Sequence, residues 1–102
     1  MSDNFNEVTG GETPVLVDFY ATWCGPCKMM GPVLAELKQR FGDRLRIIKL
    51  DIDNPANAES VRRYGVGSVP TLMLFRRGEL LWRESGARRT DEMAAILDRY
   101  IG

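Results

Sequence analysis

The fold of this chain is decided by the stretch Val15-Leu16-Val17-Asp18-Phe19-Tyr20-Ala21-Thr22-Trp23-Cys24-Gly25-Pro26-Cys27-Lys28. Its first six residues form a short apolar run, which predicts a buried strand. Near its end the stretch contains two cysteines, Cys24 and Cys27, three residues apart. They are the only cysteines among 102 residues, and the chain contains no histidine. Two thiols at this spacing can close a disulfide with each other or share a metal ion.

A metal site and a structural disulfide both explain this pair poorly. A structural zinc site takes four ligands, mostly Cys and His, and within one chain only acidic residues could complete this set. A zinc site shared between two chains stays open. A disulfide that closes a four-residue loop stabilises a fold by only about 2 kcal/mol, and a chain of this length buries a core without it. The pair therefore favours a disulfide that opens and closes.

The residues after Cys24 predict a helix that runs to about Phe41 and is stopped by Gly42-Asp43. Pro26 suits the first turn, whereas Pro32 lies inside the helix and is expected to kink it. Cys24 would lie at or just before the helix N-terminus, where free N–H groups and the helix dipole favour a negative sulfur. Lowering a thiol pKa from about 8.5 to 7 takes roughly 2 kcal/mol, which a partly buried helix terminus can supply.

The rest of the chain alternates between strand and helix patterns. We expect a strand over about 45–51, a short helix over 57–64, a hairpin of 71–75 with 79–83, and a last helix with Thr90 as its N-cap. This order predicts an α/β fold in which helices cover a mixed sheet.

Several motifs together resemble the thioredoxin family. They occur in the family's order, and they are Val15–Lys28, Arg46–Asp53, Tyr64–Leu72, Arg77–Glu79 and Ser85–Ala87. The resemblance implies the thioredoxin fold, a three-layer sandwich with a central mixed sheet, as a single domain over residues 1–102.

The beginning of the chain departs from the family pattern. Residues 1–13 are polar and too short for the family's first strand and first helix together, so we expect a truncated or irregular N-terminal segment. The sheet should then have four strands in the order second, first, third, fourth, with strand 45–51 at an edge where Arg44, Arg46 and Lys49 discourage pairing with another edge. Alternatively, residues 3–10 form a helix and the edge stays uncovered or pairs in a dimer.

Two charged residues, Asp18 and Lys49, interrupt apolar strands. Either each faces water at a strand edge, or both are buried, in which case they pair or the acid takes a proton. The resemblance implies that Asp18 lies behind Cys27 and exchanges a proton with it through water, and that Lys49 tunes this acid. It also implies that Cys24 attacks first, that Cys27 is more buried and completes the exchange, and that Gly25 and Pro26 set the redox poise.

The resemblance further implies a substrate-binding surface. Trp23 would be a flat, partly wet cover beside the sulfur, and the Val69–Pro70 bond would be cis, with the Val69 backbone pairing with an extended substrate segment. Gly86 would leave room for the substrate chain. The simpler interpretations are a core tryptophan, an ordinary turn at Val69–Pro70 and a turn glycine.

Composition and charge narrow the function. Fourteen basic and fourteen acidic residues cancel, which gives no sign of a nucleic-acid or membrane surface. No apolar run approaches membrane length, and the first seven residues do not read as a signal peptide, so we expect a reducing, cytoplasmic location.

The activity that the resemblance implies is thiol–disulfide oxidoreduction. The protein would be a protein-disulfide reductase that carries electrons to disulfide-containing client proteins in cell redox homeostasis. An NADPH-dependent flavin thioredoxin reductase would regenerate it, and it would need no bound cofactor or metal. An oxidant or isomerase on the same fold, and a non-enzymatic docking or regulatory subunit, are the alternatives.

Overall fold

A four-stranded sheet and four α-helices account for most of residues 3–101, the part of the chain that the structure, a computed structural model, describes. The strands are β1 (Val15–Tyr20), β2 (Arg46–Asp51), β3 (Thr71–Arg76) and β4 (Glu79–Ser85). The helices are α1 (Asp3–Thr9), α2 (Gly25–Phe41), α3 (Ala58–Arg63) and α4 (Thr90–Ile101), with short 3₁₀ turns at Gly42–Arg44 and Pro55–Asn57.

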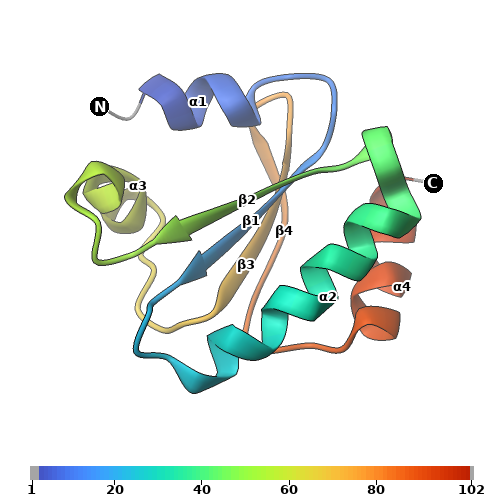
Figure 1. The fold of residues 1–102 in the computed structure, drawn as a ribbon. Helices are drawn as coiled ribbons and strands as arrows, with labels where there is room; N and C mark the ends of the chain where they lie inside the picture. The colour runs from blue at the N-terminus through green and yellow to red at the C-terminus, as the bar shows by residue number, and fades with distance from the viewer. Residues whose placement is uncertain (1–2, 102) are drawn as a thin grey trace.

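The sheet has the order β2-β1-β3-β4 (Figure 1). β1 runs parallel to β2 and antiparallel to β3, and β3 and β4 form an antiparallel hairpin. The predicted number of strands, their order and the edge position of β2 are therefore confirmed, and the architecture is the thioredoxin fold.

Helices cover both faces of the sheet (Figure 1). α2 and α4 cover the face that carries Leu16, while α1 and α3 cover the face that carries Val17 and Phe19. Because side chains alternate along a strand, Asp18 shares the α2 face with Leu16. This alternation places one carboxyl group beneath the start of α2.

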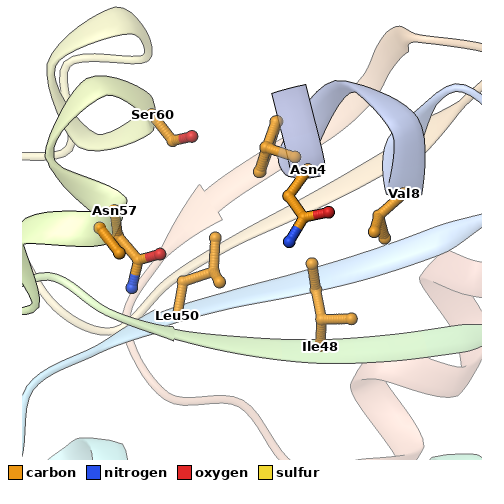
Figure 2. A pocket seen from close by; sticks show the side chains of 8 residues that line it. Asn4, Val8, Ile48, Leu50, Asn57 and Ser60 are labelled. Carbon is orange, nitrogen blue, oxygen red and sulfur yellow. The ribbon is translucent and has the colours of Figure 1, made fainter. Parts of the chain in front are cut away.

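A hollow of about 350 Å³ opens on the other face, between α1, β2 and α3 (Figure 2). Its lining is apolar in the centre, with amide and hydroxyl groups at the margin: Asn4, Phe5, Val8, Ile48, Leu50, Ala56, Asn57 and Ser60. Neither cysteine nor any charged side chain lines it, so it has no part in thiol chemistry.

The N-terminal segment is a helix rather than irregular chain, as the alternative interpretation held. A helix forms here because Phe5 has an apolar surface to cover. Phe5 is buried, and its ring packs edge-on to Phe75, with centroids 5.4 Å apart, and against Tyr64.

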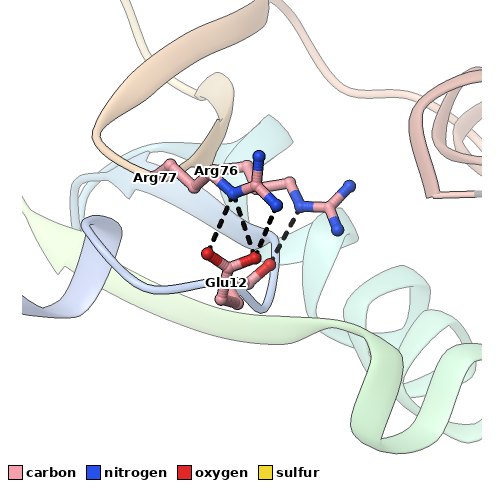
Figure 3. Close-up of polar contacts among 3 residues, drawn as sticks. All are labelled: Glu12, Arg76 and Arg77. Carbon is pink, nitrogen blue, oxygen red and sulfur yellow. Dashed lines mark hydrogen bonds and ion pairs between the residues drawn. The ribbon is translucent and has the colours of Figure 1, made fainter.

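Backbone and side-chain hydrogen bonds tie the segment after α1 to the β3–β4 turn (Figure 3). The Glu12 carboxylate accepts hydrogen bonds from Nε and Nη2 of Arg77 at 2.7–3.0 Å, and Arg76 Nε donates to the Glu12 carbonyl at 2.9 Å. The Gly78 amide donates to the Thr9 carbonyl at 2.9 Å. The segment after α1, which we expected to be truncated or irregular, is thus held by hydrogen bonds at several points.

Two helix boundaries differ from the prediction. The helix expected over 57–64 is divided into a 3₁₀ turn and α3, and Thr90 is the first residue of α4 rather than its N-cap. Arg89 occupies the cap position, because its carbonyl accepts from the Met93 amide at 3.0 Å and its own amide donates to Glu92 at 3.1 Å. α2 is assigned as one continuous helix through Pro32.

Among residues 3–101, none of the helices combines the length and the apolar character that crossing a bilayer requires.

Candidate active site

Cys24 and Cys27 form a disulfide at the N-terminus of α2. Cys24 is the N-cap residue with extended backbone, and its sulfur accepts a hydrogen bond of 3.1 Å from the Cys27 amide. Pro26 lies in the first turn, where its missing N–H costs nothing. The predicted place of Cys24 at the helix N-terminus is confirmed, and its sulfur lies where the helix dipole stabilises negative charge.

The two sulfurs differ in surroundings rather than in burial. Cys24 is 4% exposed and Cys27 is 5% exposed, so the expectation that Cys27 is the more buried one is wrong for the disulfide form. Cys24 Sγ lies 3.7 Å from the carbonyl oxygen of Val69, whereas Cys27 lines a hollow on the other side. Cys24 therefore faces the loop that carries Val69 and Pro70 (the proline loop), and Cys27 faces the hollow that Lys28 and Lys49 also line.

Asp18 is fully buried, and neither of its carboxylate oxygens has a hydrogen-bond partner among the described residues. Burial raises the pKa of this carboxyl to about 6, although the nearby charge of Lys49 lowers it in part. A carboxyl with this pKa is mostly ionised at pH 7 and can still take up a proton. The buried interpretation holds for Asp18, and it is an acid that can change its protonation state near neutrality.

Lys49 is exposed, so the water-facing interpretation holds for this residue. It is the register partner of Asp18 in the parallel β1–β2 pair, and its ammonium lies 4.8 Å from the centre of the Tyr20 ring. Lys49 and Tyr20 line a hollow of about 250 Å³ together with Cys27. Thus the cation lies beside the buried acid without burying its own charge.

Trp23 is 68% exposed, which excludes the interpretation as a core residue. Its indole Nε1 donates a hydrogen bond of 2.8 Å to the Asp53 carboxylate, so the ring is held at the surface beside Cys24. Met29, in the first turn of α2, is 67% exposed as well. Gly25 and Pro26 between the cysteines are also exposed, so uncovered apolar groups surround the disulfide.

The Val69–Pro70 peptide bond is cis, as predicted. The Pro70 carbonyl accepts a hydrogen bond of 2.8 Å from the Gly86 amide. Thr71 Oγ1 donates to the Ser68 carbonyl at 2.7 Å and contacts the Ser85 hydroxyl at 2.9 Å. These bonds hold the proline loop against the end of β4.

Gly86 is favoured by its backbone conformation and not by a lack of space. Its φ is +99°, a backbone conformation that other residues rarely adopt, and a Cβ there would meet open space. The turn interpretation is correct for the backbone, and the passage of a substrate chain here stays a prediction.

The sequence analysis missed three supporting side chains: Tyr20 beneath Lys49, Asp53 on the Trp23 indole, and Arg83, whose guanidinium donates to the carbonyls of Tyr64 and Gly65. Strand alternation gives a signal for Tyr20, because it lies two residues after Asp18. The other two contacts join residues 18 to 30 positions apart and leave no local pattern.

Within residues 3–101, no group of three or more His, Cys, Asp or Glu side chains is placed to hold a metal ion.

Comparison with known proteins agrees with this geometry. The sequence model of the thioredoxin family matches residues 1–99. The chain is 42% identical over 90 residues to a thioredoxin of Bacillus subtilis, which covers 88% of this chain and 85% of that protein. It is 48% identical over 87 residues to a thioredoxin of Mycolicibacterium smegmatis, covering 84% and 78%.

Solved structures give the same result for the fold. The crystal structure of a thioredoxin of Malassezia sympodialis superposes with a TM-score of 0.86 at 34% identity, over 98% of this chain and 88% of that one. The oxidized form of mitochondrial thioredoxin 3 of Saccharomyces cerevisiae gives 0.82 at 35% identity, over 94% and 88%.

Proposed function

Because the chain belongs to the thioredoxin family, we propose that its two cysteines divide the reduction of a partner protein's disulfide between them. The protein is a thiol–disulfide oxidoreductase, a protein-disulfide reductase that works through the reversible Cys24–Cys27 disulfide. The observation that carries the division of roles is the position of Cys24 as N-cap of α2, facing the proline loop.

The first step belongs to Cys24. In the reduced protein its thiolate is stabilised by the Cys27 amide and the helix dipole. It attacks one sulfur of the partner's disulfide and forms a mixed disulfide, and the partner's other sulfur leaves as a thiolate and takes a proton from water.

The second step belongs to Cys27 and Asp18. The Cys27 thiol gives its proton to the Asp18 carboxylate through water and attacks the Cys24 sulfur. The Cys24–Cys27 bond forms as the bond to the partner breaks, and the partner's second sulfur leaves as a thiolate that takes a proton from water. The partner has then gained two electrons and two protons, and this protein holds the disulfide seen in the structure.

The surface around the sulfurs would bind the partner chain. The exposed Trp23 ring covers one side, and the Val69 backbone offers hydrogen bonds to an extended segment beside Pro70. Open space at Gly86 admits that segment. The mainly uncharged rim suits clients of varied sequence, whereas Gly25 and Pro26 set the shape of the loop and its redox poise.

The cellular setting is part of the proposal. Residues 1–102 act as a single domain on disulfide-containing clients in a reducing, cytoplasmic location. An NADPH-dependent flavin thioredoxin reductase returns the disulfide to the dithiol. Reduction of insulin with NADPH and such a reductase tests this partner, and failure with reductases from several sources, when dithiothreitol supports the same reaction, would exclude it.

Trapping experiments test the division of roles. Cys27→Ser should accumulate mixed disulfides through Cys24, because the resolving thiol is missing, whereas Cys24→Ser should accumulate far fewer. Non-reducing electrophoresis of each variant with a disulfide-containing client measures this. The reverse distribution of covalent complexes would exchange the two roles.

A pH series tests Asp18. In the wild type, release of the client from the mixed disulfide should accelerate as pH rises through about 6, where the Asp18 carboxyl ionises. Asp18→Asn should lose this step and slow release by about tenfold or more at pH 7, since proton transfer by a positioned base is worth about 10²–10⁴-fold. An unchanged profile would remove Asp18 from the mechanism.

A further inference from the structure

Tyr20 and Lys49 make a contact that the mechanism above does not use. The Lys49 ammonium lies 4.8 Å from the centre of the Tyr20 ring, within the distance at which the negative face of an aromatic ring attracts a cation. Lys49 is exposed, and an unrestrained lysine side chain at a surface samples many rotamers. The ring therefore reduces the space through which this charge moves.

We propose that Tyr20 is a positioning residue, which holds the Lys49 ammonium over its ring and thereby sets the pH at which Asp18 can accept the proton of Cys27. This inference rests on the proposed role of Asp18 in the second step. Tyr20 packs against the cluster of Ala21, Cys24 and Cys27, and its proposed effect on Asp18 acts through Lys49.

The sheet brings the three residues together on one face. Tyr20 follows Asp18 by two residues on β1, so both side chains point toward α2. Lys49 is the register partner of Asp18 on β2, so it is the adjacent cross-strand residue. A tyrosine ring at this position can reach the lysine that stands next to the buried acid.

The charge of Lys49 matters because Asp18 has so few other partners. Its two oxygens have no hydrogen bond among the described residues, and Lys49 is the cation that opposes the effect of burial. The strength of that opposition depends on where the ammonium is held, because the interaction of two charges falls with distance.

The positive charge of Lys28 favours movement of the Lys49 ammonium away from the site, unless another group holds that ammonium in place. Lys28 and Lys49 both line the hollow of about 250 Å³ that Cys27 also lines, and two like charges repel each other when they approach. The titratable and charged groups around Asp18 and this hollow are Tyr20 from β1, Lys49 from β2, and Cys27 and Lys28 from α2, while β3 places the apolar Leu72 beside Asp18.

The direction of the effect follows. Without the ring, the Lys49 ammonium spends more time in solvent and stabilises the Asp18 carboxylate less. The pKa of Asp18 then rises, and the pH at which it becomes a proton acceptor rises with it. The free energy of a cation–π contact at an exposed site, converted into a pKa difference, sets an upper limit of about half a pH unit on this shift.

The experiment measures the titration midpoint of the Asp18 carboxyl carbon by NMR in the disulfide form, together with the pH midpoint of client release. Tyr20→Leu should raise both midpoints by up to about half a pH unit, whereas Tyr20→Phe, which keeps the ring, should leave them unchanged. Lys49→Met should raise them at least as far. Adding Tyr20→Leu to Lys49→Met should produce no further shift.

Two outcomes would overturn the proposal: a wild-type midpoint in either Tyr20→Leu or Lys49→Met, or a Tyr20→Leu shift that persists in the Lys49→Met background. The Lys49 variant keeps the ring in place, so the test survives if Tyr20→Leu fails to fold. Tyr100→Leu is the matched control, because this half-buried tyrosine packs on the core through α4; it should change stability and leave both midpoints in place.

Failure of this proposal is distinguishable from failure of the proposed function. If Asp18→Asn abolishes the pH step but Tyr20→Leu does not move it, only the role of Tyr20 is wrong. If Asp18→Asn retains the step, the role of Asp18 itself is wrong.

Discussion

The two ends of the sheet differ in the exposure and the hydrogen bonding of their acidic side chains. At the end that carries α1, the Glu12 carboxylate is exposed and accepts three hydrogen bonds from Arg77 (Figure 3). At the cysteine end, the Asp18 carboxylate is fully buried and accepts none from the described residues. The third buried side-chain atom without a partner, Arg88 Nε, also lies at the cysteine end, two residues after Gly86.

This contrast shows where the protein gives up stability for chemistry. A buried charge without a partner costs free energy, and a network of paired surface charges does not. The cost falls on Asp18, the group that we propose gains and loses a proton. At the opposite end, the hydrogen bonds of Glu12, Arg76 and Arg77 hold the segment after α1 in place. Four substitutions can break or sharpen this contrast.

Phe5→Ala should have the largest effect and should act on stability alone. The buried ring packs against three other aromatic rings and anchors α1, so its loss should cost about 3–5 kcal/mol of unfolding free energy. Urea unfolding measures the loss, and insulin reduction below the transition should stay at the wild-type rate. Phe5→Leu, which keeps apolar volume, is the control and should lose much less. A fall in activity of the folded protein would show that the two ends are coupled.

Asp18→Asn should act in the opposite direction on stability. The pKa of Asp18 is raised from 3.8 to about 6 by burial, so the folded protein loses stability relative to the unfolded chain as pH rises through this interval. Above pH 7 the whole penalty is present, about 3 kcal/mol at most for a shift of this size.

The substitution should therefore stabilise the protein by about 2–3 kcal/mol at pH 7.5 and by little below pH 4, while it slows client release. Chemical denaturation at both pH values measures this. A gain of equal size at pH 4 and pH 7.5 would mean that the cost of Asp18 is steric rather than electrostatic.

Arg83→Met should cost about 1 kcal/mol, the net value of hydrogen bonds lost from a guanidinium. Arg83 donates to the carbonyls of Tyr64 and Gly65, where the chain leaves α3 toward the proline loop. Thermal unfolding measures the stability, and the KM for insulin shows whether the loop has moved. Exposed Arg99 on α4 supplies the control as Arg99→Met, and equal effects of the two substitutions would deny Arg83 a special role.

Glu12→Gln should have the smallest effect. The hydrogen bond to Arg77 lowers the pKa of Glu12 below 4.5, so its contribution to stability is present above that pH and lost as pH falls through the lowered value. Because the pair is fully exposed, we expect a small decrease in the unfolding midpoint at pH 7 that disappears in high salt. Glu7→Gln on α1 is the control. A large decrease that salt does not reduce would contradict this view of the opposite end.

Much of the fold could be predicted from local pattern. Apolar periodicity and turn residues within a few positions predict three elements: the strand Val15–Tyr20, the helix after Cys24 and the β3–β4 hairpin. The α1 segment could not be decided in this way, because the helix depends on Phe5 meeting the rings of Tyr64 and Phe75, which are about sixty and seventy positions away.

In the candidate site, too, some features could be predicted from the sequence and others could not. The cysteine pair was visible as a motif, the family resemblance implied the cis proline, and the buried acid was one of two interpretations of Asp18. The similar burial of Cys24 and Cys27 was not predicted, and it accompanies the disulfide that joins them. Nor was the exposure of Lys49, because the sequence shows that a charge interrupts a strand but not on which side water lies.

By itself, the sequence determined the covalent chemistry: two thiols on a four-residue loop at a helix start, and one acid inside an apolar strand. These features depend on neighbours along the chain, which any conformation keeps together. The tertiary structure decided which side chains contact one another. The placement of Lys49 over Tyr20, Trp23 on Asp53 and Val69 against Cys24 depends on strands and loops distant in sequence, and only packing of the whole sheet brings their side chains within contact distance.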